Sequence, residues 1–180
     1  MLGAIAGDIA GSVYEARPIK HREFPLFHPR ARFTDDSVLT VAVAAAIATG
    51  RPYRDSVHEI GRRYPDAGYG ASFIHWLAAD DPQPYGSFGN GAAMRVSPVG
   101  FAFDEADTVL EEAARSAAIS HDHPEGIRGA QATALAVLLA RGGTRPHRIR
   151  RELGERFGYD LDRSVDAIRP GYGFDVTCQG

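Results

Sequence analysis

The sequence has 180 residues, 44% of them hydrophobic and 24% charged, with a formal net charge of −3. This profile is typical of a globular chain that folds around a single core, and it excludes a disordered protein. Because the charge balance is slightly acidic and the arginines are scattered, there is no basic surface to grip nucleic acid, which is therefore not an expected partner.

Cysteine usage and the N-terminal residues bear on the compartment. The lone cysteine, Cys178, cannot form an internal disulfide or a thiolate metal cage, so the chain suits a reducing environment. The opening "MLGAIAGDIA" lacks the basic region of a secretion signal, and the longest apolar run is interrupted before the roughly 20 residues that span a bilayer. We expect a cytoplasmic monomer without a membrane partner.

Residues 2–15, "LGAIAGDIAGSVYE", are predicted to form a helix that packs in the core. The apolar residues that share one stripe of this helix are Leu2, Ile5, Ala6, Ile9, Ala10 and Val13. Glycines at positions 3, 7 and 11 recur every four residues, which favours close approach of a neighbouring backbone or a ligand. Asp8, Ser12 and Glu15 lie along a third line, where a row of oxygen atoms is costly unless something nearby needs them.

The remaining chain predicts an all-α fold. Residues 18–30 form an ordered loop because three prolines forbid a continuous helix. Periodicity and end signals predict further helices at about residues 36–49, 55–64, 73–78, from near 91, 105–116, from 124 to the glycines at 142 and 143, and 146–157. Residues 169–180 show no helical periodicity, and no segment alternates as a strand would.

The segment "RFTDDS", residues 32–37, places two aspartates between hydroxyl residues, directly before the apolar run "VLTVAVAAAIA". Aspartates at a helix start commonly satisfy the free backbone N–H groups, and capping is the commoner explanation of such a pair. One cap suffices, however, and carboxylate and hydroxyl oxygens are also the ligands that Mg²⁺ prefers. The sequence leaves both interpretations open.

Two further segments carry groups that could contact a ligand. The glycines of "GSFGNGAAMR" allow close backbone approach, so this loop is either a phosphate-binding turn or a plain flexible one. In "SHDHP", His121 and His123 are either ligand contacts or structural residues at a helix start. The aromatic residues Tyr69, Phe73 and Trp76 are expected only to pack.

Four segments together resemble the ADP-ribosylglycohydrolase family, which includes dinitrogenase reductase-activating glycohydrolase. They are "GAIAGDIAGSVYEA", "FTDDS", "GSFGNGAAMRVSPVG" and "SHDHPEG", and their order and spacing are typical of that family. The resemblance runs over the whole chain and implies an all-α, compact orthogonal helical bundle. It also implies magnesium-dependent hydrolysis that removes ADP-ribose from modified protein side chains or small acceptors.

The resemblance assigns roles to individual residues. Thr34, Asp35 and Asp36 would help to hold a pair of Mg²⁺ ions, with Asp36 also catalytic. Glu15 would lie beside the metals as a ligand, a gate or an acid/base group. The ribose and diphosphate of the substrate would contact the residues Gly89, Asn90, Gly91 and His121.

The chain departs from the family pattern in one respect. Longer members carry a second acidic motif, D-x-D-[ST], that supplies the other half of the metal ligands, and this chain has none. The closing "GYGFDVTCQG" resembles a segment from the middle of such proteins. Residues 1–180 are therefore expected to form one domain that lacks its C-terminal part. Two alternatives remain: a non-catalytic ADP-ribose-binding or crystallin-like structural relative, and a helical interaction protein without a ligand.

Overall fold

The computed structural model describes residues 2–15, 17–173 and 175–178, and these residues confirm the all-α prediction. The described helices are α1 (Leu2–Gly11), α2 (Asp35–Thr49), α3 (Tyr53–Arg63), α4 (Ala71–Ala78), α5 (Ser97–Ala102), α6 (Ala106–Ala118), α7 (Pro124–Arg141), α8 (Pro146–Phe157) and α9 (Val165–Ile168). The predicted closing segment includes Phe174, Gln179 and Gly180, which lie outside the described residues.

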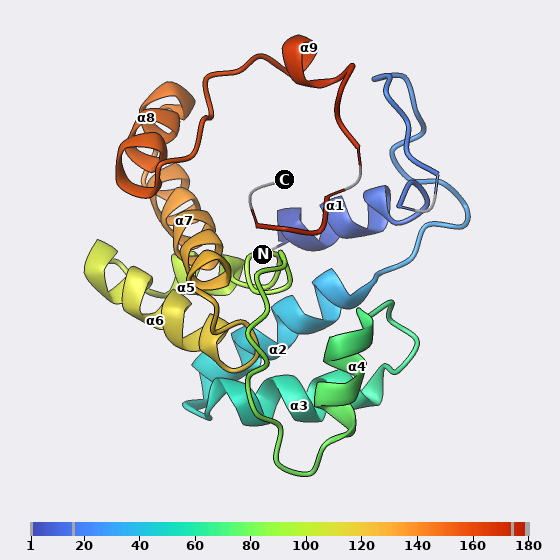
Figure 1. Cartoon of the computed structure of the whole chain (residues 1–180), viewed down its shortest axis with the longest axis vertical. Helices are drawn as coiled ribbons and strands as arrows, with labels where there is room; N and C mark the ends of the chain where they lie inside the picture. The colour runs from blue at the N-terminus through green and yellow to red at the C-terminus, as the bar shows by residue number, and fades with distance from the viewer. Residues whose placement is uncertain (1, 16, 174, 179–180) are drawn as a thin grey trace.

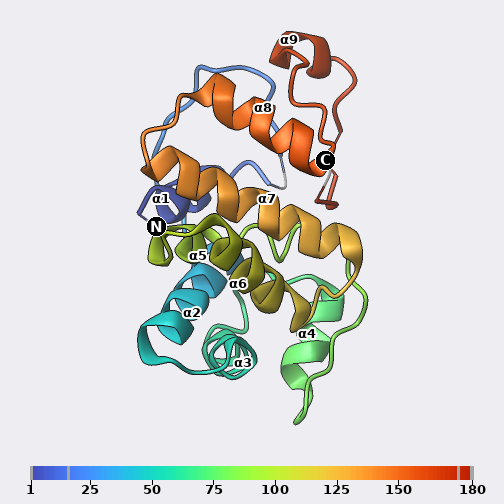
Figure 2. The same cartoon turned by 90° about the vertical axis from the view of Figure 1, so that its left-hand side faces the viewer.

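Two helices organise the packing. The α2 helix contacts α1, α3 and α5, whereas α7 contacts α5, α6 and α8. Figure 2 shows α6, α7 and α8 as successive layers, and Figure 1 shows α2 and α3 side by side beneath them. The largest core cluster lies where these two groups meet, and a smaller cluster lies between α7 and α8. Both helices thereby bury residues in these clusters, among them Leu39 and Val43 of α2 and Ala134 and Leu135 of α7.

The α2 helix is buried on most sides, as its apolar sequence predicts. Leu39, Ala42 and Val43 are almost fully buried, whereas Val41 is 44% exposed. The helix ends at Gly50, whose φ of 69° is a left-handed conformation that glycine adopts without strain. At its other end, α2 begins with the polar residues 34–37, which form its cap position and first turn.

The α1 helix differs from its prediction. It ends at Gly11 instead of continuing to residue 15, and Ala10 is its one buried residue among those described, with Leu2 84% exposed. A Cβ atom at Gly3, Gly7 or Gly11 would meet no described atom within 4 Å. The core placement is therefore wrong for residues 2–11, because α2 is the main helix that α1 contacts and it does so through polar groups.

A second correction concerns the helix predicted near Gly91. Residues 90–95 form turns, and the helix begins at Ser97 with Pro98 in its first turn. The Met94 amide donates to the Asn90 carbonyl at 2.9 Å, but this single helical bond is not continued as a helix through residues 90–95. The short helix α9 was not predicted, because four residues carry too little periodicity to recognise.

Several local predictions are confirmed. The α7 helix begins at Pro124, and Glu59 and Arg63 form an ion pair along α3. Tyr69, Phe73 and Trp76 are buried in the main core. In the part of the chain that the structure describes, no helix combines the length and apolarity that crossing a membrane requires.

Candidate functional site

The start of α2 is capped by an aspartate from another helix. Asp8 Oδ2 of α1 accepts hydrogen bonds from the backbone N–H groups of Thr34, at 2.8 Å, and Ser37, at 3.1 Å. The Thr34 hydroxyl donates to Asp8 Oδ1 at 2.6 Å, and the Ser37 hydroxyl donates to Oδ2. Asp8 therefore satisfies two of the backbone N–H groups at this helix end, as a local cap does in most helices.

This arrangement answers whether "TDDS" is a cap. Thr34 occupies the cap position but makes no side-chain capping bond, because its hydroxyl is directed to Asp8. Neither the Asp35 nor the Asp36 side chain accepts a hydrogen bond from the amide of another described residue; the Asp35 amide donates to the carbonyl of Ala67, and the Ser37 amide donates to Asp8. Asp35 and Asp36 therefore do not provide the side-chain cap that was one interpretation of the segment.

The oxygen-bearing line on α1 and its extension faces the start of α2. Besides Asp8, the Ser12 hydroxyl accepts a 3.1 Å hydrogen bond from the Arg32 amide and donates to the carbonyl of Ile9. Glu15 is close enough for the charges of Asp36 and Asp8 to raise its pKa, after the effect of burial. Asp8 thus joins α1 to the start of α2 by hydrogen bonds, and Glu15 adds a further acidic group near it.

We call Asp8, Glu15, Asp35 and Asp36 the acidic cluster, because their negative charges lie close enough to repel one another. Burial, followed by the charge of Asp36, raises the pKa of Asp35 to about 6. Burial and the charge of Asp8 also raise the pKa of Asp36. Within residues 2–15, 17–173 and 175–178, no three His, Cys, Asp or Glu side chains converge closely enough to hold a metal ion. The cluster is therefore a set of crowded but not convergent carboxylates.

Replacing Asp35 with a neutral amide is expected to stabilise the metal-free protein at neutral pH. A folded-state pKa raised from 3.8 to about 6 means that the stabilising contribution of Asp35 is complete below pH 3.8 and is lost as the pH rises through about 6. Allowing for partial solvent screening, Asp35→Asn should raise the free energy of unfolding at pH 7.5 by about 1–2 kcal/mol.

The measurement is urea unfolding in a chelator at pH 7.5 and at pH 4. The gain should shrink toward zero at pH 4, where the wild-type carboxyl is largely protonated. Asp66→Asn, at an exposed position near the same segment, is the control and should leave the unfolding midpoint unchanged. An Asp35→Asn variant with the same stability change at both pH values would contradict the assignment.

The glycine loop, residues 86–91, is held by two distant segments. The Gly86 amide donates to Asp122 Oδ1 at 2.7 Å, and the Asn90 amide donates to the carbonyl of Val176 at 2.8 Å. The Gly89 amide donates to Ser87 Oγ at 3.2 Å. The Gly91 amide and the Asn90 side chain make no hydrogen bond to the described residues, in contrast to the Gly89 and Asn90 amides.

His121 lies against this loop. The ring is buried, and a Cβ atom at Gly91 would lie 2.8 Å from its Nε2 atom, so glycine is required at position 91 for this approach. His121 Nδ1 lies 2.8 Å from Ser120 Oγ. Burial and then the charge of Arg95 lower the pKa of His121 to about 3, so the ring is neutral at pH 7. His123, by contrast, caps α7 by accepting from the Glu125 amide.

The structure thus brings the predicted residues into two groups. Glu15, Thr34, Asp35 and Asp36 lie at the meeting of α1 and α2, whereas the glycine loop and His121 lie at the start of α7. No hydrogen bond among the described residues joins the two groups directly, although the Thr40 hydroxyl of α2 donates to the Met94 carbonyl at 3.4 Å.

Sequence reasoning missed four contributors to these groups: the role of Asp8 as a cap, the buried Arg95, Ser120 and the segment 175–178. A charged residue inside the otherwise apolar "AAMRVSPVG" was a signal that could have drawn attention to Arg95. The segment 175–178 offered no such signal, because its contact with the glycine loop is long-range.

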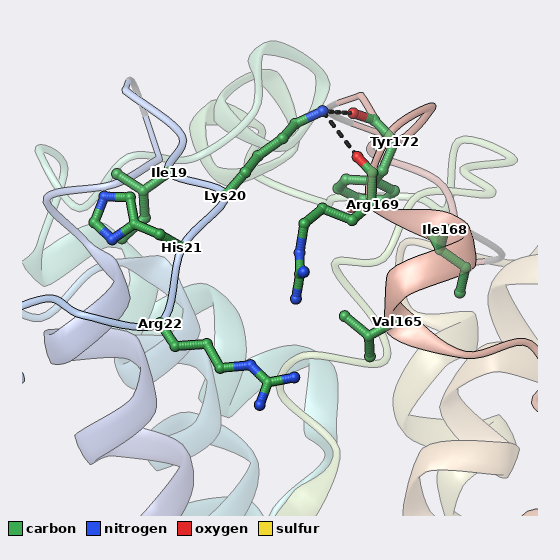
Figure 3. A pocket seen from close by; sticks show the side chains of 8 residues that line it. All are labelled: Ile19, Lys20, His21, Arg22, Val165, Ile168, Arg169 and Tyr172. Atoms are coloured by element: carbon green, nitrogen blue, oxygen red, sulfur yellow. Dashed lines mark hydrogen bonds between the residues drawn. The ribbon is translucent and has the colours of Figure 1, made fainter.

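A separate cavity of about 340 Å³ lies between the loop after α1 and the α9 region (Figure 3). Its lining consists of Ile19, Lys20, His21, Arg22, Val165, Ile168, Arg169 and Tyr172. Lys20 Nζ closes one side by donating to the carbonyls of Arg169, at 3.1 Å, and Tyr172, at 2.9 Å. None of the site residues predicted from the sequence lines this cavity, so its basic lining is distinct from the acidic cluster.

Comparison with known proteins identifies a family and several relatives that this chain matches. The family model described as ADP-ribosylglycohydrolase matches residues 1–170. The ADP-ribosylhydrolase ARH3 of Mus musculus is 30% identical over 178 residues, covering 79% of this chain and 48% of the mouse protein. The Bos taurus protein of the same name is 30% identical over 210 residues, covering 95% of this chain and 58% of its own length.

The Homo sapiens ADP-ribosylhydrolase ARH3 is 29% identical over 178 residues, covering 79% of this chain and 49% of the human protein. The chain thus spans about half the length of the curated relatives it matches. Since the family model matches nearly all of its residues and the helical fold agrees, the chain belongs to the ADP-ribosylglycohydrolase family.

Proposed function

We propose that the whole protein is a magnesium-dependent hydrolase that removes ADP-ribose from modified protein side chains or small acceptors. The observation that carries this proposal is which residue caps the start of α2. Asp8 satisfies the helix end, so the first-turn carboxylates of Asp35 and Asp36 are left without a capping role. Family membership supplies the substrate class.

The donor set at the start of α2 fits a hard divalent cation. Thr34 offers a hydroxyl and Asp35 and Asp36 offer carboxylates, and Mg²⁺ commonly combines one or two protein carboxylates with several waters. Burial and, to a smaller extent, neighbouring negative charge raise the pKa values of both aspartates, and a bound cation would offset the unfavourable burial and charge of both carboxylates. When bound, the cation would lower the pKa of a coordinated water and help to neutralise developing charge.

The proposed steps of the chain's own residues follow from their positions. Breaking the bond at the anomeric ribose carbon develops positive charge, which the carboxylates of the acidic cluster would stabilise. Glu15 is exposed, and its raised pKa suits a group that exchanges a proton with the substrate or with water. The Gly91 amide, the Asn90 side chain and His121 would hold the diphosphate and ribose.

A second candidate is a non-catalytic ADP-ribose-binding relative. It is favoured by the carboxylates of the described residues, which crowd together without converging on one point. The two functions differ in what they require of magnesium, because a binding module needs none to hold ADP-ribose.

The test is release of ADP-ribose from an ADP-ribosylated peptide by the whole protein, with Mg²⁺ and after treatment with a chelator. We expect release in Mg²⁺ and its loss in chelator. Calorimetry with ADP-ribose under the same two conditions completes the experiment. Tight binding that is independent of metal and is accompanied by no release in either condition would overturn the hydrolase and establish the binding module.

A further inference from the structure

Arg95 is a buried charge without a carboxylate partner among the described residues. Its side chain is 0% exposed. One nitrogen, NH2, donates to the carbonyl of Ser116 and to the hydroxyl of Ser120, each at 3.0 Å. The Nε and NH1 atoms have no hydrogen-bond partner in the described part of the chain, and the guanidinium lies 6.0 Å from the centre of the Phe73 ring. Burying such a guanidinium costs free energy, which indicates a role for Arg95 beyond packing.

The Ser120 hydroxyl connects Arg95 to His121. Its oxygen lies 3.0 Å from Arg95 NH2 and 2.8 Å from His121 Nδ1. A guanidinium can only donate, so Ser120 Oγ accepts from Arg95. The side chain is fully buried, and its hydroxyl has one hydrogen to place. Among the described atoms that lie within reach, His121 Nδ1 is the acceptor for it.

This donor order fixes the hydrogen on the imidazole ring. If Nδ1 accepts from Ser120, a neutral ring carries its hydrogen on Nε2. The opposite arrangement, with hydrogen on Nδ1, would leave the buried Ser120 hydroxyl hydrogen without an acceptor. The neutral state is independently favoured, because burial and the charge of Arg95 lower the pKa of His121 to about 3.

The Nε2 atom points at the glycine loop. A Cβ atom would lie 2.8 Å from Nε2 if built on Gly91 and 4.0 Å from it if built on Gly89. Nε2 makes no hydrogen bond to the described residues, so an Nε2–H group there is a donor that remains for a ligand oxygen. The backbone amide of Gly91, the residue that His121 Nε2 approaches, is a second donor in this part of the loop.

We propose that Arg95 is a positioning residue that, through Ser120, holds His121 as the neutral Nε2–H tautomer and directs that N–H toward an oxygen of the ligand on the glycine loop. The identity of that ligand, an ADP-ribosyl group, rests on the proposed function. Arg95 itself does not touch the ligand in this proposal. It acts by deciding which ring nitrogen donates.

The first measurement is the ¹⁵N NMR spectrum of histidine in the whole protein at pH 7, with the His121 signal assigned from its loss in His121→Gln. We expect one ring nitrogen bearing hydrogen, identified as Nε2, and one bare Nδ1. In Ser120→Ala the ring should become a mixture of tautomers, and affinity for ADP-ribose measured by calorimetry should fall about tenfold, the loss of roughly one hydrogen bond.

Ser116→Ala is the matched control. Ser116 is equally buried and its carbonyl accepts from Arg95, but its hydroxyl has no hydrogen-bond partner in the described structure. This variant should keep both the tautomer and the affinity. Arg95→Lys retains a donor and a charge and should preserve the Nε2–H tautomer, whereas Arg95→Met should not.

Three outcomes overturn the proposal: a wild-type ring with hydrogen on Nδ1, a charged ring at pH 7, or a Ser120→Ala spectrum identical to that of the wild type. The wild-type spectrum alone tests the tautomer even if a variant fails to fold. If the ring is the expected tautomer and the Ser120→Ala and Arg95→Met spectra change as expected but the wild type does not bind ADP-ribose, the proposed function fails and the positioning by Arg95 is supported.

Discussion

Asp36→Asn is expected to lower the rate of ADP-ribose release by at least about 100-fold while leaving the fold intact. The amide keeps the shape of the side chain but removes the negative charge that a divalent cation needs. The fold should survive because Asp36 does not cap α2, and its contact with the Thr34 hydroxyl is long, at 3.5 Å. Removing a carboxylate whose pKa is raised by burial also relieves repulsion.

The measurement combines turnover of an ADP-ribosylated peptide with the thermal midpoint in Mg²⁺ and in chelator. Wild-type protein should gain stability from Mg²⁺, and the variant should gain much less. Asp55→Asn is the matched control, because Asp55 is likewise a partly buried acid in the first turn of a helix, α3, but lies outside the acidic cluster. Unchanged turnover in Asp36→Asn would remove this residue from the metal site.

Asp8→Ala is expected to lower the free energy of unfolding by about 2–3 kcal/mol in metal-free buffer. The substitution removes the acceptor for two backbone N–H groups and two hydroxyls at the start of α2. Thr34 and Ser37 are buried, so water cannot readily replace the lost bonds. The contact between α1 and α2 should loosen as a result.

Urea unfolding monitored by circular dichroism measures this effect, and Thr34→Val provides a graded comparison. That variant loses the hydroxyl bond to Asp8 Oδ1 but keeps the backbone bond to Oδ2, so a loss of about 1 kcal/mol is expected. If Asp8→Ala unfolded within about 0.5 kcal/mol of the wild type, the capping role of Asp8 would be excluded.

Local sequence patterns were sufficient to predict helix ends that depend only on nearby residues. The apolar run after Asp36, the proline at 124 and the glycine at 50 predicted the ends of α2 and α7 to within a residue or two. The prediction near Gly91 was wrong because the one helical bond there, from the Met94 amide to the Asn90 carbonyl, is not propagated, while the Asn90 amide bonds to the distant Val176 carbonyl. Propensity describes a segment alone, and tertiary contacts override it.

The prediction that α1 is buried in the core also failed because of tertiary contacts. Its apolar stripe was a sound reason to expect burial, yet among the described residues its firm contacts are polar, through Asp8 and Ser12. The row of oxygen atoms was visible in the sequence, but the group that needed it, the start of α2, is about 26 residues away along the chain. A helical period shows which residues share a face and cannot show what that face meets.

The sequence by itself determined the helical class, most helix boundaries and the family, because these depend on local periodicity and on motif order. The tertiary structure alone decided that Asp8 caps α2, which leaves Asp35 and Asp36 uncommitted, and that Ser120 joins Arg95 to His121. Hydrogen-bond partners and desolvation depend on distances between residues far apart in sequence, and only folding sets those distances.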